Sequence, residues 1–569
     1  MTTKTPANNP LPNFYRASAA DFKKIPGNPI AYWVSDKLRK SFENLPLLEE
    51  VVEAKVGLQT GDNFYFLKLW WEVNYKNIHF NAKNRNEAIH SRCRWFPHDK
   101  GGEYRKWGGN DEYVVNWEND GQELVDFKPN SVIRNPEYYF KKGITWSRIS
   151  SNNFGVRYSD FGRIFDCNGP KIFTRNENIP FILCFLLSKI TPNLLSIINP
   201  TLTFQVGDVV KLPFNELIKN NLIIRATFEK AVNVAIKDWD SYETSWDFES
   251  LPLLSSEYKS PTIKESYTKL RSHWQEMTDE MQRLEEENNR IFIQAYGLED
   301  ELTPDVPLSE ITLTCNPHYR YGGNRTKEEL EALLLKDTMK ELISYAVGCM
   351  FGRYSLDKPG LILANQGETI KNYLKQIPNP TFMPDEDNII PILDDEYFSD
   401  DIVSRFKDFL KITFGKETLA TNLEFIAKAL TGRSTGSPEK VIRDYFIKQF
   451  YKDHVQTYKK RPIYWMFSSG KDQGFNALIY MHRYDKSTLA KMRTDYLLEL
   501  ESKLIAEVEM LSQDTTQNKA RLTKIKNQIE EMKKYDEFLN NKALSLIEID
   551  LDDGVKVNYA KFEGLVKGI

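Results

Sequence analysis

The sequence lacks the patterns that mark membrane, secreted or zinc-binding proteins. Its most apolar segment, IPFILCFLLSKI at Ile179–Ile190, is bounded by prolines and is shorter than the roughly 20 residues of a bilayer span. We therefore expect a buried helix there. Five cysteines lie far apart without a C-x-x-C pair, a spacing that excludes a zinc finger and favours a reducing compartment. Because Met1–Leu11 is polar and is not a signal peptide, the sequence predicts a cytoplasmic protein with no membrane contact.

The sequence also lacks the motifs of an S-adenosylmethionine-dependent catalyst. No glycine-rich turn follows a predicted strand. Two segments resemble the N-P-P-Y loop that would hold a flipped adenine, Asn135–Pro136 and Asn316–Tyr319, and both are predicted to be ordinary Asn-Pro turns. Thr431–Lys440 lacks the GK[ST] ending of a P-loop, and the seven histidines are scattered. We expect this chain to bind no metal or cofactor and to catalyse nothing alone.

Charge is unevenly distributed along the chain. The net charge of -4 divides into +3 for residues 1–250 and -7 for residues 251–569. A basic groove on an otherwise acidic protein is sufficient for phosphate contacts. A hydrophobic content of 41% is ample for packed cores, and the length of 569 residues predicts several domains.

Residues 55 to 174 are rich in tryptophan, tyrosine, arginine and lysine, separated by glycine turns. This segment includes KVGLQTGDNFYFLK at Lys55–Lys68 and WFPHDKGGEYRKWGGNDEYVVNW at Trp95–Trp117. Lys and Arg side chains suit phosphates, while Arg, Lys, Asn and Gln on loops can read base edges. The alternative is that some of the arginines pair with local acids, such as Asp99, Glu103, Asp160 or Asp166. The candidate DNA-binding residues are Gln59, Thr60, Asn63, Arg92, Arg94, Arg105, Lys106, Arg134, Lys141, Lys142, Arg148, Arg157 and Arg163.

Periodicity predicts several helices. Apolar residues from Tyr267 to Leu284 step by three and four, which indicates a seam buried against a partner helix. Helices are also expected within 14–53 and over Pro180–Ile198. Two leucine- and isoleucine-rich stripes, at 497–511 and 522–532, predict a helical hairpin with a polar turn at Gln513–Asn518.

Turn residues and β-branched runs predict the strands. We expect a short strand pair over Leu202–Phe214, a β-hairpin over Lys459–Tyr484 and a turn followed by a strand over Leu551–Tyr559. Between Leu302 and Lys416 the sequence predicts only short helices and proline-rich loops.

Together these patterns predict an α+β fold: a mixed recognition domain, helical spacers, a helical hairpin and a small C-terminal β element. The predicted segments are a connector at 1–54, a DNA-recognition domain at 55–215, a helical spacer at 216–300, a mixed helical and loop region at 301–458, and a C-terminal domain with the β-hairpin and helical hairpin at 459–569.

Four segments carry a resemblance to a known family. GLQTGDN…FLKLWWEV, WFPHDKGGEYRKWGGNDEYVVNWENDG, RNPEYYFKKGITWSRIS and FGVRYSDFGRIFD closely resemble the target-recognition region of the PglX family, the adenine-specific DNA methyltransferases of BREX phage-defence systems. The resemblance continues through Ala477–Tyr484 into the helical tail and so covers nearly the whole chain. Members of that family are about twice this length, and their N-terminal half holds the S-adenosylmethionine site and the N-P-P-Y loop.

The resemblance implies a role without catalysis. The chain departs from the family by lacking the catalytic half, so no catalytic residue carries over, and the connector at 1–54 would join that missing half. The implied role is to bind double-stranded DNA and present the target adenine to the methyltransferase half, with S-adenosylmethionine bound only in the full-length protein. Other BREX proteins and phage DNA-mimic inhibitors are further implied partners. The alternative is a protein-interaction scaffold, in which the predicted helices at 263–293 and 487–540 recruit partner subunits and DNA contact is incidental.

Overall fold

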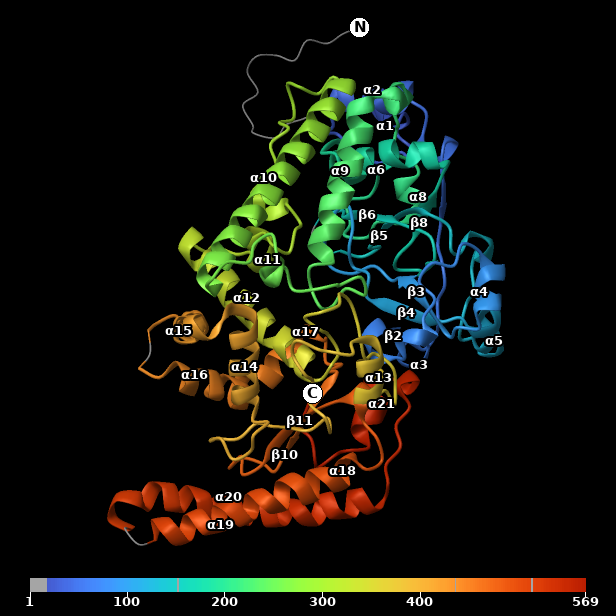
Figure 1. The fold of residues 1–569 in the computed structure, drawn as a ribbon. Helices are drawn as coiled ribbons and strands as arrows, with labels where there is room; N and C mark the ends of the chain where they lie inside the picture. Colours follow the sequence, from blue (N-terminus) through green and yellow to red (C-terminus); the bar gives the residue numbers. More distant parts are fainter. Residues whose placement is uncertain (1–17, 151–152, 435, 513–514) are drawn as a thin grey trace.

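The computed structural model describes residues 18–150, 153–434, 436–512 and 515–569 (Figure 1). With 51% helix and 9% strand in small mixed sheets, the chain has the predicted α+β class. The two β-sheets of the N-terminal half lie beside the long helices α9 (Leu222–Trp239) and α10 (Ile263–Ala295), and a helical hairpin extends along the opposite end of the molecule (Figure 1).

Two four-stranded sheets form the framework of the N-terminal half. The first has the order β1-β8-β5-β6 and is antiparallel throughout, while the second has the order β2-β4-β3-β7 with β3 and β7 parallel. Every residue of β3 and β5 is buried, because other elements cover both faces of these strands. The strand bounds are β1 (Glu53–Lys55), β2 (Leu67–Leu69), β3 (Trp95–Asp99), β4 (Tyr113–Asn116), β5 (Gly143–Trp146), β6 (Val156–Ser159), β7 (Ile164–Phe165) and β8 (Lys171–Phe173).

The apolar segment at Ile179–Ile190 forms a buried helix, as predicted. It folds as α6 (Ile179–Leu187), whose residues are buried up to Leu186, and a bend of 74° separates it from α7 (Ile190–Ile198). α6 packs against β5, β6 and α9. Among the described residues no single helix has the length and apolarity to cross a membrane, although the bent pair of α6 and α7 passes that test by length and composition.

The predicted seam on α10 is confirmed. Thr262 and Glu265 cap the start of this 33-residue helix with reciprocal side-chain-to-backbone bonds. Leu270, Trp274 and Met281 are buried along one face, on a helix that packs against α9, α7 and α15. A continuous apolar stripe at this spacing therefore joins the two halves of the molecule.

The strand pair predicted over Leu202–Phe214 is wrong. This segment contains the short helix α8 (Val206–Val209), and the N–H of Val210 donates to the carbonyl of Val206 at 3.1 Å. The backbone on either side pairs with the connector instead of with itself, since Leu48 donates to Leu212 at 2.8 Å and Phe214 donates to Pro46 at 2.8 Å. Non-local pairing has replaced the local hairpin that the Gly-Asp dipeptide predicts.

The strand predicted over Leu551–Tyr559 is also wrong, because this segment forms α21 (Val555–Ala560). Val555 and Tyr559, four residues apart, are both buried, and this is the spacing of a helix face. Gly554 precedes the helix with a φ of 86°, and the N–H of Val555 donates to Glu72 Oε2 at 2.9 Å. Burial against the N-terminal half fixes the helix.

The region from Leu302 to Lys416 contains more regular structure than predicted. α12 (Lys327–Met350) is 24 residues long, begins with a Thr326–Glu329 capping box and is almost wholly buried toward its end. Its all-round apolar C-terminal part has no amphipathic stripe, which is why periodicity does not reveal it.

The remaining helices are α1 (Ala19–Phe22), α2 (Asp36–Asn44), α3 (Asn63–Phe66), α4 (Arg85–Ser91), α5 (Glu118–Asp126), α11 (Pro317–Tyr321), α13 (Ile370–Gln376), α14 (Ile402–Phe414), α15 (Leu419–Thr431), α16 (Pro438–Tyr445), α17 (Tyr451–Thr457) and α18 (Thr488–Lys491).

Both predicted C-terminal hairpins are present. β10 (Tyr464–Ser468) pairs with β11 (Asn476–Tyr480), and β9 (Ile390–Pro391) adds a third strand. α19 (Leu498–Leu511) and α20 (Thr515–Leu544) form the helical hairpin, which projects past the body of the molecule in Figure 1. Of the turn predicted at Gln513–Asn518, residues 513–514 lie outside the described residues, as does the N-terminal segment 1–17. The prediction is wrong for residues 515–518, which form the start of α20.

One large apolar core runs through the molecule from Ile25 to Leu565 and includes side chains from all five predicted segments. A smaller cluster lies within residues 58–173 and includes Leu58, Phe96 and Trp117. Because the large core is continuous, the domain boundaries given by the sequence stay predictions.

Candidate nucleic-acid interface

Two loops, residues 56–63 and 128–141, lie side by side. Gln59 and Val132 exchange two backbone hydrogen bonds of 2.9 and 2.8 Å, and the Asn135 amide donates to the carbonyl of Val56 at 2.9 Å. At Gly61, with a φ of 77°, a Cβ would lie 2.5 Å from the carbonyl oxygen of Asn130, so only glycine allows this approach. The loops thus hold each other in place on the surface.

The short helix α3 follows directly from the first loop. Asp62 caps it by accepting hydrogen bonds from the N–H groups of Phe64 and Tyr65. Thr60 is buried and donates to Asn63 Oδ1 at 2.7 Å, while Asn63 is exposed. Phe64 and Tyr65 are about half exposed, at 52% and 49%. The cap therefore presents two aromatic rings beside the polar loop.

Sequence reasoning did not single out Phe64 and Tyr65. The available signal is the NFYF string inside an otherwise polar, turn-rich segment. We define the two-loop surface as its exposed members: Gln59, Asn63, Phe64, Tyr65, Arg134 and Lys141.

Two lysine side chains lie near the Phe64 ring of this surface. The Lys68 ammonium lies 5.2 Å from the Phe64 ring, and Lys556, which comes from α21, lies 6.0 Å from the same ring. Burial lowers the pKa of Lys68. The hydrogen bond from the Tyr65 hydroxyl to Glu123 raises the pKa of Tyr65, and the nearby Arg94 guanidinium opposes this effect. Lys556 was not predicted, because it is almost 500 residues distant in sequence.

Three further candidates, Arg92, Lys142 and Arg148, are not members of the two-loop surface. Arg92 ends α4 in the left-handed region, with a φ of 56°, and is exposed. Lys141 lies over the Tyr138 ring at 4.7 Å. Lys142 is half-buried and pairs with Asp160 at 3.3 Å. Arg148 follows β5, where its backbone bonds to Asn168 and Phe204.

Arg105 and Lys106 are buried in the interior. The Lys106 ammonium contacts the Glu285 carboxylate of α10, and that attraction raises the pKa of Lys106 against the opposing effect of burial. Arg105 lies 3.4 Å from Asp238 and 4.8 Å from the Trp239 ring, both on α9. These two side chains attach the loop between β3 and β4 to the long helices and are not available to a duplex in this conformation.

Arg157 and Arg163 are likewise held inside the protein. Arg163 contacts Asp111 and lies 3.5 Å from Asp99, while Arg157 is 3% exposed and burial lowers its pKa. Arg105, Lys106 and Arg163 therefore pair with acidic side chains of the protein, which was the alternative to DNA contact. Two of the actual partners, Asp238 and Glu285, lie more than a hundred residues away in sequence, so local inspection did not find them.

The two N-P-P-Y look-alikes are turns. Asn316 caps α11, and its amide donates to the carbonyls of Leu308 at 2.7 Å and Ile311 at 2.8 Å. Asn135 precedes a single helical turn with a φ of 50°. Both amides are committed to the fold. Among residues 18–150, 153–434, 436–512 and 515–569, no group of three or more His, Cys, Asp or Glu side chains could hold a metal ion.

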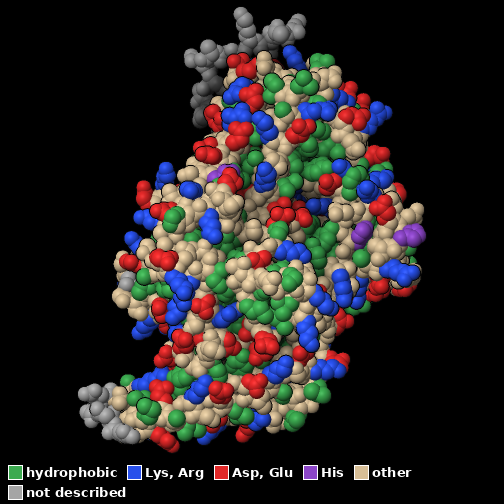
Figure 2. All heavy atoms as spheres, viewed as in Figure 1, with side chains coloured by type: hydrophobic (Ala, Val, Ile, Leu, Met, Phe, Trp, Pro, Cys, Tyr) green, Lys and Arg blue, Asp and Glu red, His purple; other side chains and the backbone are tan. Residues whose placement is uncertain are grey.

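Charges of both signs are intermixed over the face of the molecule in Figure 2. On this face the basic side chains lie in small groups among acidic ones. Small groups of this kind give local phosphate contacts without a strong long-range field.

Comparison with known proteins gives one consistent result. No family model matches the chain. It is 39% identical over 567 residues to the adenine-specific methyltransferase BrxX of Escherichia coli O9:H4 (strain HS), which covers 96% of this chain and 45% of that protein. It is 38% identical over 587 residues to the adenine-specific methyltransferase PglX of Lacticaseibacillus casei (strain Zhang), which covers 99% of this chain and 46% of that protein. Nearly the whole chain is thus homologous to part of proteins named BrxX and PglX adenine-specific methyltransferases, and it spans about half the length of these curated relatives.

Proposed function

We propose that this chain is the DNA-recognition portion of a site-specific adenine-N6 DNA methyltransferase in a BREX phage-defence system. It would correspond to the C-terminal half of such an enzyme, act in the cytoplasm, bind duplex DNA and present the target adenine to a separate methyltransferase portion. Homology over nearly its whole length to two adenine-specific methyltransferases supports this assignment.

The observation that carries the proposal is the composition of the two-loop surface. Gln59 and Asn63 offer amide groups that can both donate to and accept from base edges. Arg134 and Lys141 supply phosphate contacts, and the exposed Phe64 ring is suited to stacking on a base or entering a base step. The mutual hydrogen bonds of the loops fix these groups before any ligand binds, which reduces the entropic cost of association.

S-adenosylmethionine is the cofactor that such a reaction requires, and the described residues of this chain do not fit it. No helix among the described residues begins at a glycine-rich turn after a strand, and the amides of Asn135 and Asn316 are already bonded to backbone carbonyls. In this proposal the cofactor and the methyl transfer belong to the other portion of the enzyme. Other BREX proteins and phage DNA-mimic inhibitors are proposed partners, and an inhibitor of that kind would compete for the two-loop surface.

The first test is DNA binding by variants of the two-loop surface. Arg134→Ala with Lys141→Ala should weaken binding to plasmid-derived duplexes and reduce the log–log salt slope by about 1.8, since each phosphate contact contributes about 0.9. Phe64→Ala should weaken binding with little change in that slope. The matched controls are Lys264→Ala with Arg283→Ala on α10, and Phe538→Ala on α20, whose side chains are also exposed.

The second test is methylation. The chain alone should not label plasmid DNA with S-adenosylmethionine, and adding the N-terminal methyltransferase portion of a relative should give site-specific labelling. Labelling by the chain alone would refute the division of roles. Wild-type DNA affinity in the surface variants, together with loss of partner binding on changes in α10 or the α19–α20 hairpin, would favour the scaffold alternative.

A further inference from the structure

A segment from the far end of the chain lies directly beside the two-loop surface. The Asp552 carboxylate accepts hydrogen bonds from the N–H of Asn74 at 3.1 Å and from the Asn77 amide at 2.6 Å. Glu72 Oε2 accepts the N–H of Val555, the first residue of α21, at 2.9 Å. These three bonds fix α21 against the N-terminal half, close to α3 and β2 (Figure 1).

Lys556 is the cation that this arrangement adds to the surface. Its side chain is exposed, and its ammonium lies 6.0 Å from the centre of the half-exposed Phe64 ring. Gly554, in the turn before α21, packs on Lys68 of β2 so closely that a Cβ would lie 2.9 Å from Lys68 Cδ. In the described part of the chain Lys556 forms no ion pair, so its charge is available to an external anion.

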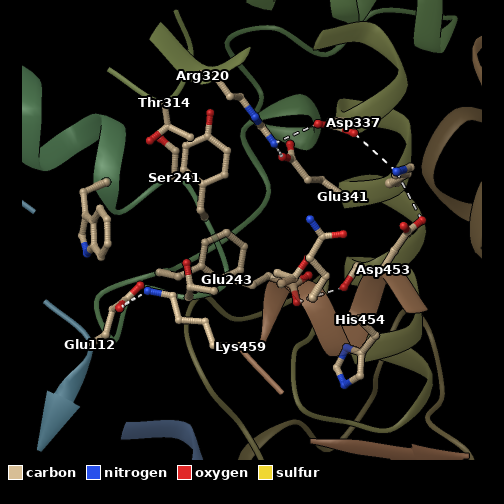
Figure 3. Close-up of a pocket in the computed structure, with 18 of the residues that line it drawn as sticks. Glu112, Ser241, Glu243, Thr314, Arg320, Asp337, Glu341, Asp453, His454 and Lys459 are labelled. Carbon is tan, nitrogen blue, oxygen red and sulfur yellow. Dashed lines mark hydrogen bonds and ion pairs between the residues drawn. The ribbon is translucent and has the colours of Figure 1, made fainter. Parts of the chain in front are cut away.

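The loop after α17 approaches the same place from another part of the C-terminal half. Arg461 Nε lies 3.4 Å from Glu72 Oε2, the same carboxylate oxygen that holds the start of α21. Lys459 pairs with Glu112, and Figure 3 shows these two side chains pointing toward each other. Lys460, between Lys459 and Arg461, is exposed and forms no ion pair with any described residue.

The backbone of this loop is held in an unusual conformation. Lys459 and Lys460 have φ angles of 51° and 59°, in the left-handed region that favours glycine. Their N–H groups donate to the carbonyls of Gln456 at 3.1 Å and Val455 at 2.8 Å, which ends α17. Non-glycine residues in this region cost free energy and are concentrated at functional sites. Two successive lysines here therefore favour a role for their side chains.

The charges of this area leave a basic excess on its surface. Arg461 and Lys459 are paired with Glu72 and Glu112, whereas Lys460 and Lys556 have no such partner. Asp553 adds one exposed negative charge in the turn before α21. A lysine ammonium is a compact, flexible point charge that suits a phosphate.

We infer that Lys460 and Lys556 contact phosphates of the same duplex that the two-loop surface binds, so that the DNA-binding surface spans both halves of the chain. This inference rests on the proposed function and adds to it a contact from the C-terminal half. Because Glu72 links α21 and the loop after α17 to the N-terminal half, these lysines keep a fixed position relative to Phe64.

The test is the salt dependence of duplex binding by the full chain. Lys460→Gln with Lys556→Gln should weaken binding roughly tenfold or more at about 0.1 M salt and reduce the log–log salt slope by about 1.8, because each phosphate contact contributes about 0.9. Combined with Arg134→Ala and Lys141→Ala, the reduction should reach about 3.6. The matched control is Lys519→Gln with Lys526→Gln, two exposed lysines of α20, which should bind as the wild type does.

A change of opposite sign provides a second test. Asp553→Asn removes a negative charge from the turn before α21 and should tighten duplex binding, whereas Glu537→Gln, an exposed change on α20, should not. Equal binding by these two variants would contradict a phosphate path across this turn. Circular dichroism should be the same for all of these variants, since each substituted side chain is exposed.

The two pairs of basic residues separate this inference from the proposed function. A reduced slope for the Arg134 and Lys141 variant together with a wild-type slope for the Lys460 and Lys556 variant would overturn the inference and leave the proposed function intact. The reverse result would support the contact from the C-terminal half and refute the assignment of the two-loop surface. A wild-type chain without salt-dependent DNA binding would refute both.

Discussion

At the scale of single residues, burial decides what each basic side chain does. Lys106 and Lys141 lie in the same tryptophan- and lysine-rich stretch of sequence. Lys106 is 6% exposed and contacts Glu285, whereas Lys141 lies on the surface over the Tyr138 ring. A buried charge needs its partner for stability, while an exposed one is free to meet a phosphate.

Replacing Lys106 should therefore affect the fold more than binding. Lys106→Ala leaves Glu285 buried without its partner, and we expect the free energy of unfolding to fall by about 3–5 kcal/mol. Lys141→Ala should change it by less than about 0.5 kcal/mol. Urea unfolding followed by circular dichroism measures both values. Equal stability of the two variants would show that the Lys106–Glu285 contact has no net effect.

Glu243 should make stability depend on pH. Its pKa is about 7 in the folded chain and near 4.5 when unfolded, so the folded state holds a proton that the unfolded state has lost between these values. The contribution of Glu243 to the free energy of unfolding is therefore fully present below about pH 4.5. This contribution decreases as the pH rises to 7, by up to about 1.4 kcal/mol for each pH unit. Asp240, with a pKa raised to about 6 mainly by burial, acts in the same direction.

Glu243→Gln should remove most of this decrease in unfolding free energy with rising pH. Unfolding free energies at about pH 5, 6 and 7 should decline less steeply in Glu243→Gln than in the wild type, with Glu249→Gln as the control. Identical pH profiles in all three proteins would mean that Glu243 titrates normally in the folded state.

At the scale of elements, one carboxylate of α20 fixes the turn between β10 and β11. Glu531 accepts hydrogen bonds from the Ser469 hydroxyl at 2.6 Å and from the N–H groups of Asp472 at 2.7 Å and Gly474 at 3.1 Å. The projecting helical hairpin is therefore attached to the third sheet at a defined point.

Removing that carboxylate should loosen the turn. Glu531→Ala leaves three donors without an acceptor, and we expect a loss of about 1–3 kcal/mol. Hydrogen exchange of the Asp472 and Gly474 amides should accelerate, whereas the adjacent exposed Glu530→Ala should leave it unchanged. Unaltered exchange in Glu531→Ala would show that the strand pairing alone holds the turn.

Local periodicity succeeded for elements with a clear stripe and failed where distant contacts decide the conformation. The seam of α10 and the hairpin of β10 and β11 follow directly from sequence spacing. Leu202–Phe214 and Leu551–Tyr559 carry turn dipeptides and β-branched residues, yet each forms a helix because its backbone or side chains meet a segment far away.

At the scale of the whole molecule, the N-terminal and C-terminal halves share one core. Trp71 of the first half donates to the carbonyl of Arg461 at 3.1 Å and packs edge-on against Tyr458, with ring centres 5.2 Å apart. Val555 of the last helix is bonded to Glu72. A cleaved or truncated chain should lose this shared core.

This predicts a single cooperative unfolding transition. Circular dichroism at helix wavelengths and tryptophan fluorescence should give the same midpoint in urea, because most of the 11 tryptophans lie in the N-terminal half while most of the long helices lie beyond it. Two separated midpoints would show that the halves are independent folding units.

The sequence by itself determined the α+β class, the buried helix at Ile179–Ile190, the seam of α10 and both C-terminal hairpins, because each depends on spacing within one segment. It also located the aromatic and basic stretch from which the two-loop surface is built. Only the tertiary structure decided that Arg105, Lys106 and Arg163 are structural cations and that Phe64 is exposed beside Lys556. It alone brought the Glu243 carboxyl group together with the hydroxyls of Tyr458 and Ser344. These outcomes depend on which distant side chains meet, and the free energy of a charge or a ring is set by those neighbours rather than by its position along the chain.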